Sequence, residues 1–591
     1  MDAQSGRVPG GGTPTAPRRA RRKDGPGYRG GPEQISGRPA RSGPGLKPPG
    51  LGGCLSAGIF RALPGPKSET TAAAGPGQTW ADLGLVAGLA ALVRFYRLDH
   101  WGFWFDEAHS LALAANPDPA AVVAKGIVDQ QAPLFFILLH FWLRVGQSDY
   151  FLRSLPALIG VGTVLAVYWL GYELGGRPAA RLAGVLAALS SYLVYYSQYL
   201  RGYILVALAF GVGAAALFRG LRTGRPGWWV VYVLAGAVAA YTHQFGLVAL
   251  AGLAAAGFFL VVAGGADRRQ LGGWAAAHAA LLLACLPWLG VLWEQFRRVQ
   301  AGLDAWVEPV TLNSWKTLYD WLWFRTRAEY GLPVDAGLRL LRYALTLVMA
   351  LFLLRAAARR EWGPAAVALL LAGPPALVFG ASLIGRPVWD PRFMVFAAVP
   401  FLVLLAAAVT ALAGRGLRLA LGLGLILGMV PPLGSYYLDP TFANPEVREA
   451  VAWLSLNRKP AEPVLHPNEQ SFLPALWYNR RFVSPPASGF RVFCPWPTPP
   501  PGWCEQSPTA DYWVGGLDGP LPVDRLLAES GQSRAFVVVL YNRHRPGERE
   551  EFAARLRAAL PRPYEATLAA GFLGVDVYEV RSGLRLAAGE P

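Results

Sequence analysis

Long apolar stretches recur along this chain from residue 81 onward. Each is about as long as the roughly 20 residues that a helix needs to cross some 30 Å of hydrocarbon. Their recurrence predicts an all-α polytopic membrane bundle. We place eleven spans near residues 81–98, 153–172, 181–197, 203–221, 228–243, 246–263, 272–289, 336–354, 363–384, 393–412 and 416–435.

Composition supports an integral membrane protein. The mean hydropathy is +0.30, and only 16% of residues are charged, against roughly a quarter in soluble domains. The net charge of +17 does not indicate nucleic acid as a partner, because Arg and Lys lie in an N-terminal arm and in short loops rather than in one basic domain. Four cysteines are too few for a disulfide scaffold.

Basic loops alternate along the chain with loops that are poor in basic residues. Because basic loops favour the cytoplasmic side, this alternation predicts a cytoplasmic N-terminus. The loop that holds Asp106, the loops 198–203, 290–335 and 386–392, and the tail beyond 436 then lie outside the cell. The cytoplasmic loops contain Arg177, Arg181, Arg219, Arg222, Arg225, Arg268, Arg269, Arg355, Arg359, Arg360, Arg415 and Arg418.

The apolar segment 133–143 is too short to span a membrane comfortably. Counting it as a span would also invert every later loop. We therefore predict an interfacial helix that lies on the outer surface and covers a cavity together with the Asp106 loop.

The two ends of the chain differ from the bundle in composition. Residues 1–78 are rich in Gly and Pro, which predicts a disordered, basic, cytoplasmic segment. No long apolar run precedes Leu83, so the segment lacks the usual layout of a signal peptide. The transmembrane domain covers 79–435, with an outer loop at 99–152.

Residues 436–591 have the pattern of a small extracytoplasmic α/β domain. Glu446–Leu456 and Glu548–Leu560 show helical apolar spacing, and Ala535–Tyr541 is typical of a buried strand. Cys494 and Cys504 are close enough in sequence to form a loop-closing disulfide in an oxidising compartment.

Two adjacent carboxylates, Asp106 and Glu107, follow the first span within the aromatic-rich segment Trp101–Ser110. If residues 81–98 span the membrane, the pair lies just beyond the bilayer, where a partly desolvated carboxylate can act as a base. A solvated acidic pair in a loop is the simpler interpretation of this decapeptide by itself, and the rest of the sequence favours the functional one.

Five motifs follow one another in a recognisable order. They are Trp104-Phe105-Asp106-Glu107-Ala108, Gln131-Ala132-Pro133-Leu134-Phe135-Phe136 before Leu143-Arg144, Arg153-Ser154-Leu155-Pro156-Ala157-Leu158, Tyr196-Ser197-Gln198 with Arg201-Gly202-Tyr203, and Tyr241-Thr242-His243. In this order, over roughly residues 81–480, the chain resembles bacterial glycosyltransferase family 39, whose relatives include protein O-mannosyltransferases and the lipid A aminoarabinose transferase.

The resemblance implies a GT-C fold and transfer of a sugar from a polyprenyl-phosphate carrier at the outer face of the bacterial cell membrane. The acceptor is left open as a lipid, a glycan or a protein. Many members have His-Pro-Pro where this chain has Gln131-Ala132-Pro133, and an acidic residue where it has Tyr199. No cofactor is therefore assigned, and a need for a divalent metal is left open.

The implied inverting reaction needs a base and cations. Asp106 matches the family's base position, and Glu107 is the expected supporting acid that orients the acceptor or a cation. Arg201, His243 and Arg392 lie at outer ends of spans, where they can stabilise the departing phosphate. The alternatives are interfacial anchoring for the two arginines and a satisfied helix-end histidine. Trp306, Trp315, Trp321 and Trp323 fit either an acceptor cleft or an aromatic belt.

Two other functional classes share these sequence features. A transporter or flippase of a lipid-linked substrate would have the same spans, but we see no internal repeats of the kind that transporters show. A non-catalytic envelope protein with a glycan-binding outer domain is the second alternative.

Overall fold

The computed structural model describes residues 76–300, 307–324, 332–459, 462–467, 469–482, 492–493, 512–514, 517, 519–543 and 545–582. All of them belong to one compact unit. The predicted N-terminal segment up to residue 75, Trp306 and the cysteines Cys54, Cys494 and Cys504 lie outside the described residues.

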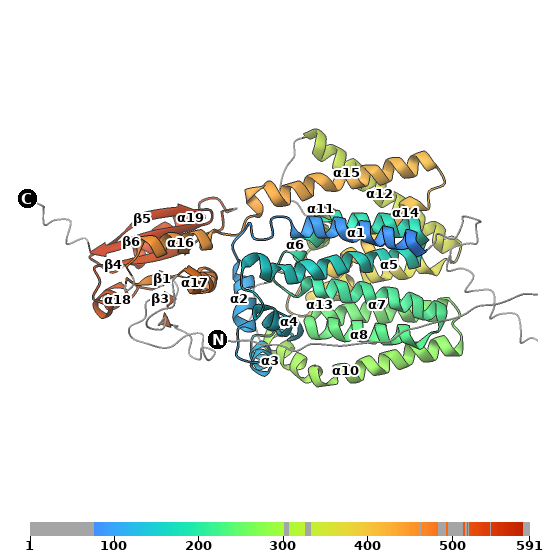
Figure 1. Cartoon of the computed structure of the whole chain (residues 1–591), viewed down its shortest axis with the longest axis horizontal. Coiled ribbons are helices and arrows are strands. Elements are labelled where there is room, and N and C mark those ends of the chain that lie inside the picture. The colour runs from blue at the N-terminus through green and yellow to red at the C-terminus, as the bar shows by residue number, and fades with distance from the viewer. Residues whose placement is uncertain are drawn as a thin grey trace, which may run out of the picture. The chain divides into compact units, whose positions relative to one another are not determined.

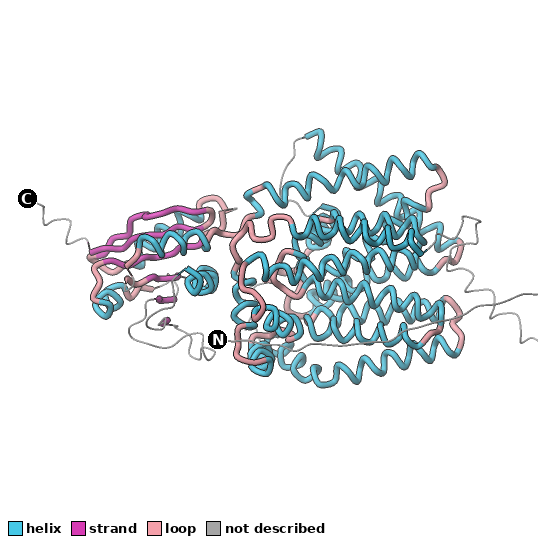
Figure 2. The backbone as a smooth tube through the Cα atoms, viewed as in Figure 1, coloured by secondary structure: helices cyan, strands magenta, loops and turns pink. Residues whose placement is uncertain are grey.

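Long helices packed side by side make up most of the described chain, and the strands come only from its C-terminal part (Figures 1 and 2). The helices of the bundle are α1 (Pro76–Phe95), α5 (Asp149–Leu189), α6 (Ser191–Ser197), α7 (Tyr203–Thr223), α8 (Pro226–Thr242), α9 (Phe245–Ala263), α10 (Arg268–Gln300), α11 (Leu312–Phe324), α12 (Leu332–Ala358), α13 (Trp362–Ile384), the 3-10 helix η2 (Pro391–Ala397), α14 (Ala398–Thr410) and α15 (Arg415–Leu438).

Eight helices in the described part of the chain are long and apolar enough to cross a membrane. The difference from the eleven predicted spans has three sources. α5 joins two predicted spans across a kink at Gly175 and Gly176. α8 has only 17 residues, and Asp82 and Arg94 lower the mean hydropathy of α1. The protein is therefore a multi-pass membrane protein with a helical bundle.

The kink in α5 reverses the chain. Gly176 has φ +69°, a conformation that favours glycine. A Cβ atom on Gly171 would lie 3.1 Å from Cα of Ala180 and 3.2 Å from Cβ of Ala183, so the segments before and after the kink pack closely. Small residues allow such close contact between membrane helices.

Ion pairs tie the helices together at the end of the bundle where α1 begins. Asp82 of α1 pairs with Arg177 at 2.6 Å and with Arg181 at 2.8 Å. Glu173, which is fully buried, pairs with Arg219 and Arg222. The first two predicted cytoplasmic loops thus lie at one end of the bundle, although the side of the membrane that this end faces stays a prediction.

Three short helices follow the opposite end of α1 and precede α5 (Figure 1): α2 (Phe105–Ala114), α3 (Pro119–Val128) and α4 (Leu134–Leu143). α4 has ten residues and buries Phe135, Phe136 and Leu139. Its buried side chains belong to the same apolar cluster as Leu111 of α2. The predicted short helix is confirmed, and its place at the membrane surface stays a prediction.

The C-terminal part contains a six-stranded sheet in the order β2-β3-β1-β4-β6-β5. The four strands on one side pair in parallel, whereas β6 pairs antiparallel with β4 and β5. The predicted α/β character is confirmed by α16 (Val447–Asn457), β4 (Arg534–Leu540) and α19 (Glu548–Ala559). The other elements are β1 (Val464–His466), α17 (Glu469–Phe482), β2 (Val492–Phe493), β3 (Tyr512–Val514), α18 (Val523–Ser530), β5 (Tyr564–Phe572) and β6 (Val575–Ser582).

Candidate functional site

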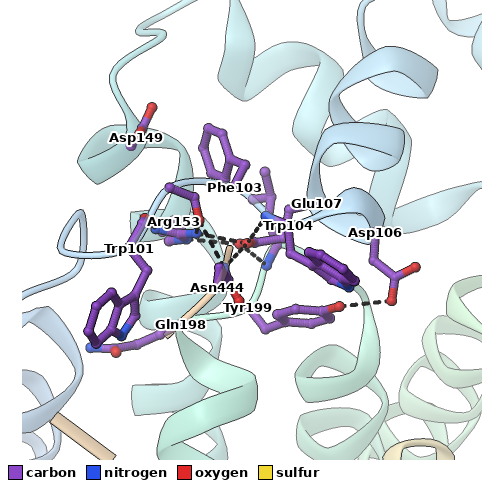
Figure 3. Close-up of polar contacts among 12 residues, drawn as sticks. Trp101, Phe103, Trp104, Asp106, Glu107, Asp149, Arg153, Gln198, Tyr199 and Asn444 are labelled. Atoms are coloured by element: carbon purple, nitrogen blue, oxygen red, sulfur yellow. Dashed lines mark hydrogen bonds and ion pairs between the residues drawn. The ribbon is translucent and has the colours of Figure 1, made fainter. Parts of the chain in front are cut away.

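The start of α2 sets the direction of the two adjacent carboxylates. The backbone N–H of Trp104, which precedes the helix, donates to Oε2 of Glu107 at 3.1 Å. A glutamate at the third helical position commonly folds back in this way to satisfy a free N–H. Because successive helical residues differ by about 100°, Asp106 then points away from Glu107 (Figure 3).

Asp106 is held by three side chains from other elements. Its Oδ1 accepts a hydrogen bond from Nη2 of Arg201 at 3.0 Å, and its Oδ2 accepts one from the hydroxyl of Tyr199 at 2.8 Å. Nη1 of Arg392 lies 3.6 Å from the same Oδ2. The Asp106 side chain remains 17% exposed, so that a bound molecule can reach it.

These neighbours decide the ionisation of Asp106. Burial raises the pKa of its carboxyl group, but the Arg201 guanidinium, the Tyr199 hydroxyl and Arg392 together lower it more, so the pKa lies below the ordinary 3.8. Burial, and then Asp106 itself, raise the pKa of Tyr199 well above 10. At neutral pH the site therefore holds a carboxylate beside a protonated tyrosine.

Glu107 is buried in a separate ionic cluster. Nε and Nη2 of Arg153 donate to its two oxygens at 2.8 and 2.7 Å. It also accepts hydrogen bonds from the backbone N–H of Leu200 and, at 3.3 Å, from Nδ2 of Asn444. With a side chain 1% exposed, Glu107 faces protein groups rather than the cavity.

The two predicted arginines meet at Asp106, whereas His243 lies apart from it. The His243 ring lies 5.4 Å from the Tyr203 ring and 5.2 Å from the Phe393 ring, centre to centre. Its Nδ1 accepts a hydrogen bond from the backbone N–H of Phe245 at 3.2 Å. Among the described residues, no hydrogen bond or ion pair joins it to Asp106.

Sequence reasoning missed four partners of the predicted site residues. Tyr199 and Asp390 each stand two positions before a predicted arginine, and this proximity was the available signal. Asp390 accepts a hydrogen bond from the backbone N–H of Arg392 and pairs with its Nε at 3.0 Å. Arg153 begins one of the five ordered motifs, but nothing in the sequence pairs it with Glu107, 46 residues away. Asn444 had no comparable signal, because it reaches Glu107 from 337 residues away.

A cavity of about 440 Å³ opens beside Asp106. Aromatic, amide and charged side chains from the bundle and the C-terminal part line it. Trp321 is among them, whereas Trp315 packs on Trp389 and Trp323 packs on Phe401. The lining residues are Trp104, Asp106, Tyr195, Tyr196, Tyr199, Trp321, Arg392, Phe442, Ala443, Asn444, Pro445, Gln470, Leu540, Tyr541, Asn542, Arg543, Glu548, Phe552 and Gly574.

The part of the chain that the structure describes brings no three His, Cys, Asp or Glu side chains together in the manner of a metal site. Both oxygens of Asp106 already accept hydrogen bonds from Arg201 and Tyr199. The donors around Asp106 thus fit an anion better than a cation.

The bundle, its three short helices and the appended sheet define a polytopic membrane protein with the GT-C fold. The solved structure of ArnT from Cupriavidus metallidurans in the apo state has this fold, with a TM-score of 0.50, 14% identity, and coverage of 85% of this chain and 98% of that chain. No protein-family model and no curated protein matches the sequence.

Two further solved structures are similar at lower scores. ArnT from the same organism bound to undecaprenyl phosphate has a TM-score of 0.48 and 15% identity, with coverage of 85% of this chain and 98% of that one. The oligosaccharyltransferase AglB from Archaeoglobus fulgidus, in complex with an inhibitory peptide and a dolichol-phosphate, has a TM-score of 0.44 and 15% identity, with coverage of 78% and 69%.

Proposed function

We propose that the protein is an inverting membrane glycosyltransferase that moves a sugar from a polyprenyl-phosphate carrier to an acceptor at the outer face of the bacterial cell membrane. The observation that carries the proposal is Asp106, an ionised carboxylate at the edge of a cavity and bound by two arginines. The GT-C fold and the ordered sequence motifs support it.

Asp106 acts as the general base in this proposal. It takes the proton of an acceptor hydroxyl as that oxygen attacks the anomeric carbon of the donor sugar. The bond between the anomeric carbon and the phosphate oxygen breaks on the opposite face, and its electron pair leaves with the polyprenyl phosphate. One displacement inverts the configuration of the anomeric carbon.

Arg201 and Arg392 stabilise the charge that develops on the departing phosphate. Nε of Arg201 is buried and has no hydrogen-bond partner among the described residues, so it becomes a donor for an anion only if the side chain turns toward the cavity. Arg392 divides its ion pairs between Asp106 and Asp390. A bound phosphate therefore competes with Asp106 for both guanidinium groups, and donor binding makes the carboxylate more basic.

We expect Arg201→Ala to weaken donor binding and turnover more than Arg201→Lys does. Lysine keeps the charge but loses the planar fork that binds phosphate through two hydrogen bonds. His243→Ala should have a milder effect, because the imidazole packs among aromatic rings rather than on Asp106. The measurement is the apparent KM for the donor together with kcat. If Arg201→Ala kept the wild-type KM and kcat, the proposed role in phosphate binding would be wrong, and Arg201 would be an interfacial anchor.

The test of the function itself uses the purified full-length chain in lipid nanodiscs. A panel of undecaprenyl-phosphate sugars is supplied with membrane extract as the acceptor source, and the release of undecaprenyl phosphate is measured. We expect acceptor-dependent release for one donor. Translocation of a donor across proteoliposomes without release would instead favour a flippase.

The predicted orientation is tested by cysteine labelling from outside the cell in a chain without its four native cysteines. Ser110 is fully buried, so the exposed Ala115, five residues further along, is the better outer probe. Thiols at Ala115 should react with an impermeant maleimide, whereas thiols at Thr223 and Arg359, which are also exposed, should not. The reverse pattern at Thr223 would mean that residues 133–143 cross the membrane.

A further inference from the structure

The segment that delivers Asp106 to the cavity is the non-helical stretch Leu98–Trp104 between α1 and α2. In the bundle, Arg153 binds it through the carbonyl oxygens of Leu98, Trp101 and Gly102, at 3.2, 2.6 and 3.1 Å. Further contacts come from the C-terminal part of the chain, more than 300 residues away, and the proposed reaction assigns them no role.

Tyr478 of α17 makes the most buried of these contacts. Its hydroxyl accepts a hydrogen bond from the backbone N–H of Phe103 at 2.7 Å and donates one to Oδ2 of Asp149 at 2.9 Å. Its ring stacks on Phe103 with the ring centres 6.1 Å apart. Tyr478 is fully buried and Asp149 is only 5% exposed. The hydroxyl therefore joins this segment to the first turn of α5.

Arg448 and Asn444 bind backbone carbonyl groups of the same segment, just before Phe103. Arg448 donates to the carbonyl oxygens of Asp99 and His100 at 3.0 and 3.2 Å, and it pairs with Asp149 at 3.3 Å. Asn444 donates to the carbonyl oxygen of Gly102 at 2.8 Å and to Glu107, the residue next to Asp106.

The segment lies close against the C-terminal part of the chain at Gly102. A Cβ atom there would lie 3.1 Å from Cβ of Arg448 and 3.6 Å from the hydroxyl oxygen of Tyr478. The backbone of Gly102 therefore packs directly against the side chains of Arg448 and Tyr478, which leaves little room for the segment to shift. Figure 3 shows Phe103, Arg153, Asn444 and Glu107 gathered on one side of α2, with Asp106 on the other.

We propose that Tyr478, Asn444 and Arg448 are positioning residues, through which the C-terminal α/β domain fixes the segment Leu98–Trp104. The fixed segment in turn holds the Asp106 side chain within hydrogen-bond distance of Arg201 and Tyr199. The inference rests on the proposed function, because the position of the Asp106 carboxylate matters for transfer only if Asp106 is the base. Active-site side chains tolerate displacements of only about 0.5 Å, and a domain that holds the segment through four hydrogen bonds limits such displacements.

The test compares Tyr478→Phe with Tyr578→Phe in the full-length chain. Both tyrosines are buried in the C-terminal part and donate to a buried aspartate, but Tyr578 bonds Asp576, away from the Asp106 segment. We expect Tyr478→Phe to speed amide hydrogen exchange in residues 99–113 by about tenfold or more, because the local opening loses a buried restraint. Exchange in β4 should not change. Tyr578→Phe should leave residues 99–113 at the wild-type rate.

A second measurement reports whether Asp106 is still paired with Arg201. Labelling with a carbodiimide and glycine ethyl ester across a pH series, followed by peptide mass spectrometry, gives the midpoint at which Asp106 becomes protonated. The charged and titratable groups facing it are Arg201, Tyr199, Tyr203, Arg392 and His109. If Tyr478→Phe loosens the pairing with Arg201, the midpoint should rise, by about one pH unit for a tenfold loss of preference for the charged form.

Neither readout needs a sugar donor, so the positioning proposal and the proposed reaction fail separately. Asn444→Ala, which removes a different contact to the same segment, should give the same two changes in smaller measure. Wild-type exchange in residues 99–113 and a wild-type Asp106 midpoint in both Tyr478→Phe and Asn444→Ala would overturn the proposal. So would equal acceleration of exchange in β4, because Tyr478 would then only stabilise its own domain.

Discussion

Asp106→Asn is expected to reduce sugar transfer by about 10²–10⁴, the usual loss when a general base is removed. The substitution keeps the size of the side chain and an oxygen that can accept from Arg201, but the amide does not take a proton from the acceptor hydroxyl. Because Asp106 lies at the edge of the cavity, with 17% of its side chain exposed, folding should persist. The measurement is the rate of acceptor-dependent release of undecaprenyl phosphate.

Donor affinity separates this result from a general loss of structure. Arg201 and Arg392 remain in Asp106→Asn, and the competing carboxylate is gone, so the donor should bind at least as tightly as to the wild type. A variant that turns over at near the wild-type rate would mean that another group is the base. Loss of both transfer and donor binding would mean that Asp106 organises the arginines instead.

Glu107→Ala is expected to destabilise the protein by about 3–5 kcal/mol, the usual cost of leaving one member of a buried ion pair alone. The Glu107 and Arg153 side chains are only 1% and 4% exposed, so little water can replace the lost carboxylate. The change also removes the acceptor of the backbone N–H groups of Trp104 and Leu200. The measurement is the thermal unfolding midpoint in detergent, together with the fraction of protein that elutes as a single species.

Glu529→Ala is the matched control for this prediction. Glu529 pairs with Arg525 at 2.7 Å, but Arg525 is 58% exposed, and exposed pairs contribute about 1 kcal/mol at most. Glu107→Gln should lie between the control and the alanine variant, because it keeps the shape but not the charge. If Glu107→Ala unfolded at the wild-type midpoint and lost only transfer, the original sequence prediction of an acceptor-orienting acid would be right.

Local sequence patterns predicted the elements of this protein well. The apolar stretches became long helices, and Glu446–Leu456, Ala535–Tyr541 and Glu548–Leu560 were found within a residue or so as α16, β4 and α19. Two of the predicted spans, 153–172 and 181–197, begin on opposite sides of the non-helical backbone at Gly175 and Gly176, although both glycines lie within the bounds of α5. Hydropathy reports which residues lipid or the core can accept, but it does not report how the chain reverses between two spans.

The sequence by itself determined the class of the protein and singled out Asp106 as a candidate site residue, because apolar length, the alternation of basic loops and an acidic pair beside the first span are local properties. Only the tertiary structure decided that the two adjacent carboxylates do different things. Asp106 meets Arg201 and Arg392, from 95 and 286 residues away, at the cavity. Glu107 is buried against Arg153 and Asn444. Helical geometry sends neighbouring side chains in different directions, and what each one meets depends on contacts that sequence order does not record.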